Sequence, residues 1–83
     1  MKQLLKLIVD QIVENPKEVK IKESLDNEIV VFNLSVAPDD MGRIIGKNGK
    51  IIRAIRTLLR TRAFKEGKKV QVILATEDEN QTN

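Results

Sequence analysis

The segment Gly46-Lys47-Asn48-Gly49 has the residue types and spacing of a turn that can hold a phosphate. Glycine has no side chain to keep a partner at a distance, and it adopts backbone φ values that other residues avoid. The turn also leads into an apolar helical pattern that begins at Lys50. Unpaired N–H groups at the start of a helix favour an anion. These residues therefore indicate a site for the backbone of a nucleic acid.

Basic residues are concentrated around this turn. The 83-residue chain has a formal net charge of +3, but residues 41–69 contain ten basic residues and one acid. That segment is therefore +9 and the remainder of the chain is −6. Every arginine lies between Arg43 and Arg62, and the planar guanidinium suits phosphate. Most charge runs are solvated helix faces, but a run centred on a Gly-x-x-Gly turn favours a polyanionic partner.

The composition restricts the class of protein. A hydrophobic content of 41% and a charged content of 33% predict one small globular domain. No apolar run approaches the ~20 residues of a membrane span and no signal peptide is evident, so we expect a cytoplasmic protein. The chain contains no cysteine and no histidine, which removes the commonest metal ligands and general base. We therefore predict a protein that is not an enzyme and holds no metal or cofactor.

Nucleotide-binding loops do not fit the glycine spacing. A P-loop needs four residues between its glycines and a hydroxyl after the lysine, but only three residues separate Gly42 from Gly46, and Asn48 follows the lysine. The spacing of Gly42, Gly46 and Gly49 also fails the dinucleotide fingerprint. Asp39-Asp40 is the one notable carboxylate pair near the turn, and the start of a helix explains it better than catalysis does.

The hydrophobic pattern predicts an α+β domain over residues 1–75, in the order α-β-β-α-α-β, with a three-stranded sheet packed against three helices. We expect helices over about 2–14, 37–45 and 50–64, and strands over about 19–22, 28–36 and 70–74. Turn chemistry at Ser24-Leu25-Asp26-Asn27 joins the first two strands in a hairpin. Phe32 falls on the apolar face of the second strand and is expected in the core. Residues 76–83 are polar and are expected to form a disordered tail.

Ile45-Gly46-Lys47-Asn48-Gly49-Lys50-x-Ile52, set between two helices in this order of elements, resembles the KH domain of type II. The resemblance covers about residues 2–75 and is greatest to small single-domain bacterial proteins of the KhpA family. It implies an RNA chaperone or post-transcriptional regulator that binds single-stranded RNA. It also implies a homodimer, or a heterodimer with a larger KH protein of the KhpB (Jag/EloR) type. In Gram-positive bacteria the family is tied to cell-wall growth and cell shape.

The resemblance also assigns roles to individual residues. KH domains clamp about four nucleotides of a single strand. Backbone amides at the two glycines would meet phosphate, with charge from the turn and from neighbouring arginines. Isoleucines would form the apolar flank of the groove, with Ile29 or Val31 near its other edge. The implied RNA-binding residues are Gly46, Lys47, Asn48, Gly49, Lys50, Arg43, Arg53, Ile44, Ile45, Ile52 and Ile55.

Each assignment has a plainer structural alternative. The glycines could form an ordinary helix-helix turn, and core packing explains much of the burial expected for the isoleucines. Arg56 and Arg60 point away from the apolar face, so a solvated face explains them best. Lys47 differs, because a cation at the tip of a tight turn has no evident intramolecular task. With no Trp or Tyr and only two Phe, the chain lacks a base-stacking platform, which predicts modest affinity, weak sequence preference and strong salt dependence.

The third predicted helix is apolar over nearly half its circumference, because Ala54 and Leu58 extend its core-facing arc. Either the helix is deeply seated, or these two residues meet another protein chain. A small domain gains from such burial. This leaves a rival function, a protein-interaction adaptor with a KH fold and little RNA binding. An adaptor would tolerate an acid in the turn, whereas this chain has Lys47-Asn48.

Overall fold

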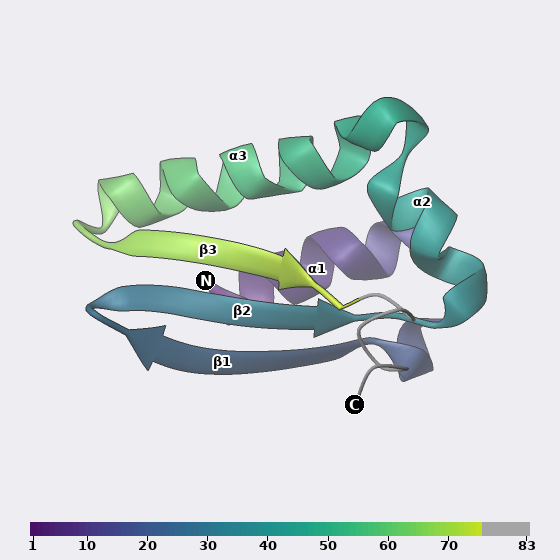
Figure 1. Ribbon diagram of the computed structural model, residues 1–83, viewed down its shortest axis with the longest axis horizontal. Coiled ribbons are helices and arrows are strands. Elements are labelled where there is room, and N and C mark those ends of the chain that lie inside the picture. Colours follow the sequence, from purple (N-terminus) through teal and green to yellow (C-terminus); the bar gives the residue numbers. More distant parts are fainter. Residues whose placement is uncertain (76–83) are drawn as a thin grey trace.

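The computed structural model describes residues 1–75 and contains three helices and three strands in the predicted order (Figure 1). Short 3₁₀ turns precede β1, α2 and α3. The α+β fold is thus confirmed, and the expected tail over residues 76–83 lies outside the described part. The elements are α1 (Lys2–Ile12), β1 (Lys20–Asp26), β2 (Ile29–Ser35), α2 (Met41–Ile45), α3 (Lys50–Lys65) and β3 (Lys69–Leu74).

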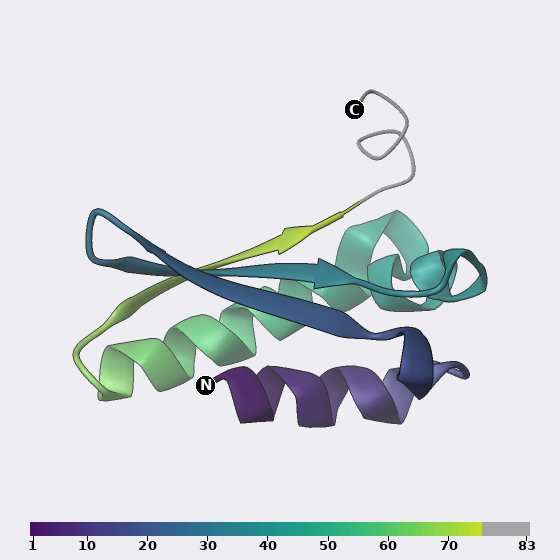
Figure 2. The same ribbon diagram turned by 90° about the horizontal axis from the view of Figure 1, so that it is seen from below.

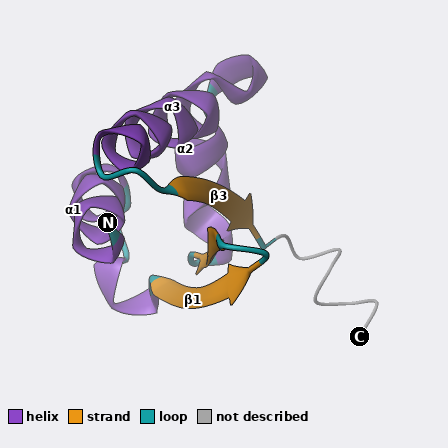
Figure 3. Cartoon of the chain, turned by 90° about the vertical axis from the view of Figure 1, so that its left-hand side faces the viewer, coloured by secondary structure: helices purple, strands orange, loops and turns teal. Residues whose placement is uncertain are grey.

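The strands form one mixed sheet in the order β1-β2-β3. β1 pairs antiparallel with β2, whereas β3 pairs parallel with β2 after the crossover through α2 and α3. The helices α1 and α3 lie on one face of this sheet, and no other element of residues 1–75 covers the opposite face, which we call the bare face (Figures 2 and 3). Because β3 is the last strand in this order, it is an edge strand, and it runs beside α3 (Figure 1).

The core forms between the covered face of the sheet and the helices. Phe32 and Leu34 alternate along β2 with residues of the bare face, and they are 1% and 0% exposed. The expectation that Phe32 belongs to the core is thereby confirmed. Phe32 belongs to one buried cluster with apolar side chains from every α-helix and from β3, namely Leu5, Val9, Ile44, Ile52, Ile55, Leu59 and Val72. Within residues 1–75, no helix is long and apolar enough to cross a membrane.

The hairpin turn lies further along the chain than predicted. Ser24 pairs with Val31 in the sheet, and Asp26 pairs with Ile29, so the loop is the two residues Asn27 and Glu28. Both have positive φ, 50° and 67°, as a two-residue turn that matches strand twist requires. The prediction of a turn at Ser24–Asn27 was wrong because pairing with the apolar centre of β2 outweighs the turn propensity of Ser24 and Asp26.

Candidate nucleic-acid interface

The Gly-x-x-Gly turn joins α2 to α3 at one end of the molecule (Figure 1). Gly46 has φ 74° and ψ 174°, a conformation restricted to glycine. Gly49 has φ 74° and ψ 17°, and Asn48 has φ 57° and ψ 26°. These two positions are left-handed, which asparagine tolerates better than most residues with a side chain. The two glycines and the asparagine are thus the residue types that this backbone demands.

Gly46 is also fixed by close packing. A Cβ atom at this position would lie 2.9 Å from the Ile51 Cβ and still closer to the Ile51 Cγ1 atom. At Gly49 the nearest atom to an added Cβ is the Arg53 Nη1, at 3.9 Å. Gly46 therefore serves the fold, whereas the surface at Gly49 is open except for an arginine. The two glycines of the turn have different tasks.

The turn closes on itself through three backbone hydrogen bonds and leaves other donors free. The N–H of Gly46 donates to the Gly42 carbonyl at 2.8 Å, and that of Gly49 to the Gly46 carbonyl at 3.1 Å. The Lys50 N–H donates to the Lys47 carbonyl. Among residues 1–75, these bonds leave the N–H groups of Lys47 and Asn48 without an acceptor. Unpaired, exposed amides are the groups that a phosphate oxygen can bind.

The cations around the turn are exposed and have no partner in the described part of the chain. No hydrogen bond or ion pair there engages the side chains of Lys47, Lys50 or Arg53. Arg53 lies one turn into α3, and its guanidinium approaches Gly49. The structure therefore brings these three predicted residues together on one open surface.

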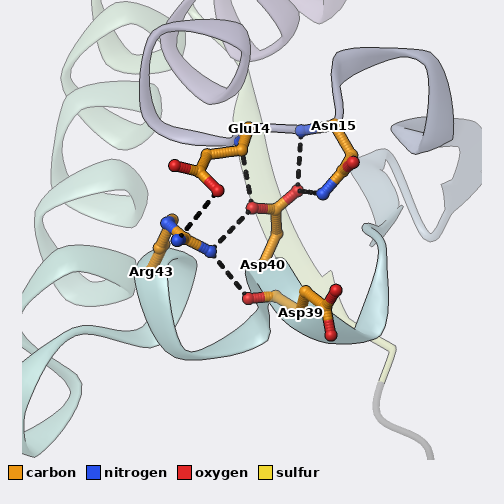
Figure 4. A network of polar contacts seen from close by, with 5 residues as sticks. All are labelled: Glu14, Asn15, Asp39, Asp40 and Arg43. Carbon is orange, nitrogen blue, oxygen red and sulfur yellow. Dashed lines mark hydrogen bonds and ion pairs between the residues drawn. The ribbon is translucent and has the colours of Figure 1, made fainter.

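Arg43 faces a different environment. Its Nη1 donates to the Asp39 carbonyl at 2.8 Å and to Asp40 Oδ1 at 3.2 Å, and its Nη2 lies 3.0 Å from Glu14 Oε1 (Figure 4). The side chain is 41% exposed, but its charge is directed at two carboxylates. Arg43 thus belongs to an internal network that sequence reasoning did not predict.

The centre of that network is Asp40, which is fully buried. Its carboxylate accepts hydrogen bonds from the backbone N–H groups of Glu14 and Asn15 and from the Asn15 side chain (Figure 4). The Glu14 backbone bond, with help from Asn15 and Arg43, lowers the pKa of Asp40 against the opposing effect of burial. The sequence explanation of Asp39-Asp40 as helix-start residues was incomplete, because the Asp40 carboxylate makes no cap bond to α2. It holds the segment after α1 instead.

The predicted isoleucines lie at different depths. Ile44 and Ile55 are 0% and 2% exposed, so they belong to the core, and Ile52 is 6% exposed. Only Ile45 is half-buried beside the turn. The prediction that Ile29 or Val31 lies at the other edge of the groove was wrong, because alternation along β2 puts their side chains on the sheet face opposite Phe32 and Leu34, where Val31 is 7% exposed. They lie across the sheet from the helices that carry the turn.

Arg56 corrects another expectation. It is half-buried rather than solvated, and its Nε donates to the Val72 carbonyl at 3.1 Å. Arg60 is exposed one turn further along α3. Together with β3 they line a groove of about 410 Å³, whose residues are Arg56, Arg60, Val70, Gln71, Val72, Ile73 and Leu74. No pattern in the sequence predicts this contact, because it depends on how α3 lies against the free edge of β3.

The apolar extension of α3 is not seated in the core. Ala54 is exposed, Leu58 is 54% exposed and Ile51 is 38% exposed. The structure therefore excludes the deeply seated alternative for this helix.

Elsewhere in residues 1–75, no three acidic side chains gather closely enough to hold a metal ion.

A type II KH domain is the class of protein that this fold and turn define. Comparison with known protein families matches residues 2–74 to the KhpA/KhpB KH domain, and the chain belongs to this family. An RNA-binding protein KhpA from Clostridium perfringens is 44% identical over 72 residues, covering 87% of this chain and 96% of that protein. One from Clostridium acetobutylicum is 46% identical with the same coverage. One from Chlamydia pneumoniae is 42% identical over 77 residues, covering 93% and 99%.

Proposed function

We propose that this protein binds single-stranded RNA by clamping its backbone at Gly46-Lys47-Asn48-Gly49. The observation that carries the proposal is the turn itself, where exposed amides without acceptors lie beside three cations without partners. Relatives that share more than two-fifths of the sequence are named RNA-binding proteins. The binding residues are the turn with Lys50 and Arg53, supported from within by Ile44, Ile52 and Ile55. Ile45 offers the apolar surface next to the turn.

Replacing Lys47 and Asn48 together with Asp tests the clamp. Both side chains are exposed, so the fold should tolerate the change, and two acids at the tip should repel phosphate. We expect binding of a single-stranded RNA, measured by fluorescence anisotropy at two salt concentrations, to weaken by at least about tenfold. Unchanged binding would refute the clamp and favour the adaptor function.

A matched control is available on the bare face of the sheet. Lys20 and Asn33 are exposed there, and changing both to Asp alters the net charge by the same amount with the same residue types. Affinity should change much less in this control. Equal losses in both variants would mean that only the net charge of the protein attracts the RNA.

We further propose that the exposed apolar strip on α3, formed by Ile51, Ala54 and Leu58, pairs with a second KH chain. The occupant is another copy of this protein or a KhpB-type (Jag/EloR) protein. Support comes from the exposure of Leu58, 54%, and from membership of a family that includes both KhpA and KhpB. Leu58→Asp should lower the oligomeric mass seen by light scattering, whereas Leu25→Asp, at a position that is 72% exposed on β1, should not. A folded Leu58→Asp variant of unchanged mass would refute the interface.

The biological role that we propose is that of an RNA chaperone or post-transcriptional regulator, with effects on cell-wall growth and cell shape. Family membership supports this role. Cross-linking in cells followed by sequencing of the bound RNA should recover a set of transcripts with the native protein. The set should be lost with the Lys47→Asp, Asn48→Asp variant and retained with the control at Lys20 and Asn33. Recovery that is the same for all three proteins would contradict it.

A further inference from the structure

The free edge of β3 presents backbone groups in a fixed alternation. In an edge strand, every second residue directs its N–H and C=O away from the neighbouring strand. The Ala75 N–H donates to Leu34 on the β2 side, whereas the Val72 carbonyl accepts from Arg56 on the opposite side. The outward set is therefore the even-numbered residues of β3, with Val72 at the centre. Its N–H and C=O both face the groove beside α3.

Arg56 changes what this groove offers to a ligand. Its Nε uses the Val72 carbonyl at 3.1 Å, so the central acceptor of the edge is occupied. The Val72 N–H, the two Nη groups of Arg56 and the exposed guanidinium of Arg60 remain, and all of them are donors. At its centre the groove is therefore rich in donors and poor in acceptors.

We propose that this groove discriminates in favour of guanine and against adenine in the bound strand, with Arg56 as the specificity-determining residue. Guanine presents two adjacent acceptors, N7 and O6, which arginine binds bidentately, whereas adenine presents an acceptor beside an amino donor. That amino group would meet the Nη donors of Arg56 and the Val72 N–H, and the Val72 carbonyl beside them already accepts from Arg56. The proposal rests on the clamp function, because the base belongs to the strand that the turn holds.

The position of the groove fits a strand held at the turn. Arg56 lies six residues after the start of α3 at Lys50, about 9 Å along the helix axis. A KH domain holds about four nucleotides, so a base beside the clamp can reach this distance. A peptide added as a fourth strand fits less well, because strand addition uses the carbonyls of the edge as well as the N–H groups. Arg56 already occupies the central one.

The test compares two RNA oligonucleotides that differ in one base. Each is a uridine octamer with a single central guanine or adenine, and binding is measured by anisotropy with a pure uridine octamer as reference. The native protein should bind the guanine oligonucleotide about tenfold more tightly than the adenine one. Arg56→Leu uncovers the Val72 carbonyl and removes the fork, so the preference should vanish or reverse. Arg62→Leu removes the same charge from α3 outside the groove and should keep the preference.

The outcomes separate this inference from the clamp. If the native protein binds no octamer, the proposed function fails and the inference fails with it. If it binds guanine and adenine octamers equally, or if Arg56→Leu keeps the preference, the inference is overturned while the clamp stands. Thermal melting shows whether Arg56→Leu is folded. Arg56→Lys keeps the charge and lacks the bidentate fork, so it should also lose most of the preference, and retention of the full preference would overturn the inference.

Discussion

The carboxylate of Asp40 accepts one hydrogen bond from the backbone N–H of Asn15 and another from the Asn15 side chain, across 25 positions of sequence. The Glu14 N–H donates to the other carboxylate oxygen. α1 ends at Ile12 and α2 begins at Met41, so this one side chain fastens the segment after α1 to the start of α2. It thereby fixes the short helix that carries the clamp at its far end.

Asp40→Asn should destabilise the protein strongly. The substitution keeps the shape, but an amide group then faces backbone N–H donors, which leaves a buried donor unpaired. We expect the melting temperature to fall by about 10 °C, measured by circular dichroism. Asp39→Asn is the control, because the Asp39 side chain is exposed and Arg43 uses only its backbone carbonyl. Similar melting temperatures for the two variants would contradict the role of Asp40.

Stability should also fall in acid because of Asp40. Hydrogen bonds from Glu14 and Asn15 lower its pKa below the ordinary value of 3.8. A carboxyl whose pKa is lower in the folded state binds protons more readily when unfolded, so it stabilises the protein above the unfolded pKa. That contribution should be complete above about pH 5 and lost as the pH falls through 3.8 and then through the lower folded pKa.

A comparison of two proteins isolates this effect. The Arg62 side chain also lowers the pKa of Glu66 through a hydrogen bond, so the native protein loses more than one contribution in acid. Melting temperatures of native protein and Asp40→Asn, measured from pH 7 to pH 2.5, should converge as the pH falls. A constant difference across this range would show that the charge of Asp40 does not contribute.

The local sequence pattern predicts the helices and strands, but it does not predict the contacts between them. The period of Val30, Phe32 and Leu34 gave the central strand, and the glycine spacing gave the turn, because each depends on neighbouring residues. The sequence pattern predicts only a helix-start role for Asp40, because its partners Glu14 and Asn15 lie in a distant segment. Helical periodicity predicts a solvated Arg56, because it places this residue outside the core-facing stripe. It does not reveal that the edge of β3 lies beside that position. Long-range pairing likewise moved the hairpin turn to Asn27.

The two glycines of the clamp should respond differently to the same substitution. Gly46→Ala places a Cβ against Ile51 in a conformation restricted to glycine, so we expect a loss of about 3 kcal/mol in the free energy of unfolding. Gly49→Ala meets open space apart from Arg53 and adopts a left-handed conformation, which costs about 1 kcal/mol. Urea denaturation measures both.

The order of the two variants should reverse when RNA affinity is measured instead of stability, because Gly49 lies where the strand would pass. Gly49→Ala should remain folded, but it adds a methyl group where the strand would pass. Its affinity for RNA should therefore fall although the fraction of folded protein does not. Gly46→Ala should lose binding only to the extent that the turn is distorted or the protein unfolds. Full RNA affinity in Gly49→Ala would mean that the backbone of the strand does not approach this glycine.

The salt dependence of binding should distinguish Arg53 from Arg43. For a single strand, each phosphate contact contributes about 0.7 to the slope of log K against log salt concentration. Arg53 has no intramolecular partner among residues 1–75 and lies beside Gly49, so Arg53→Gln should reduce the slope by about that amount. Arg43 is directed at Asp40 and Glu14, so Arg43→Gln should leave the slope nearly unchanged while lowering the melting temperature. A reduced slope with Arg43→Gln would instead place this arginine on the RNA, as its position in the sequence first indicated.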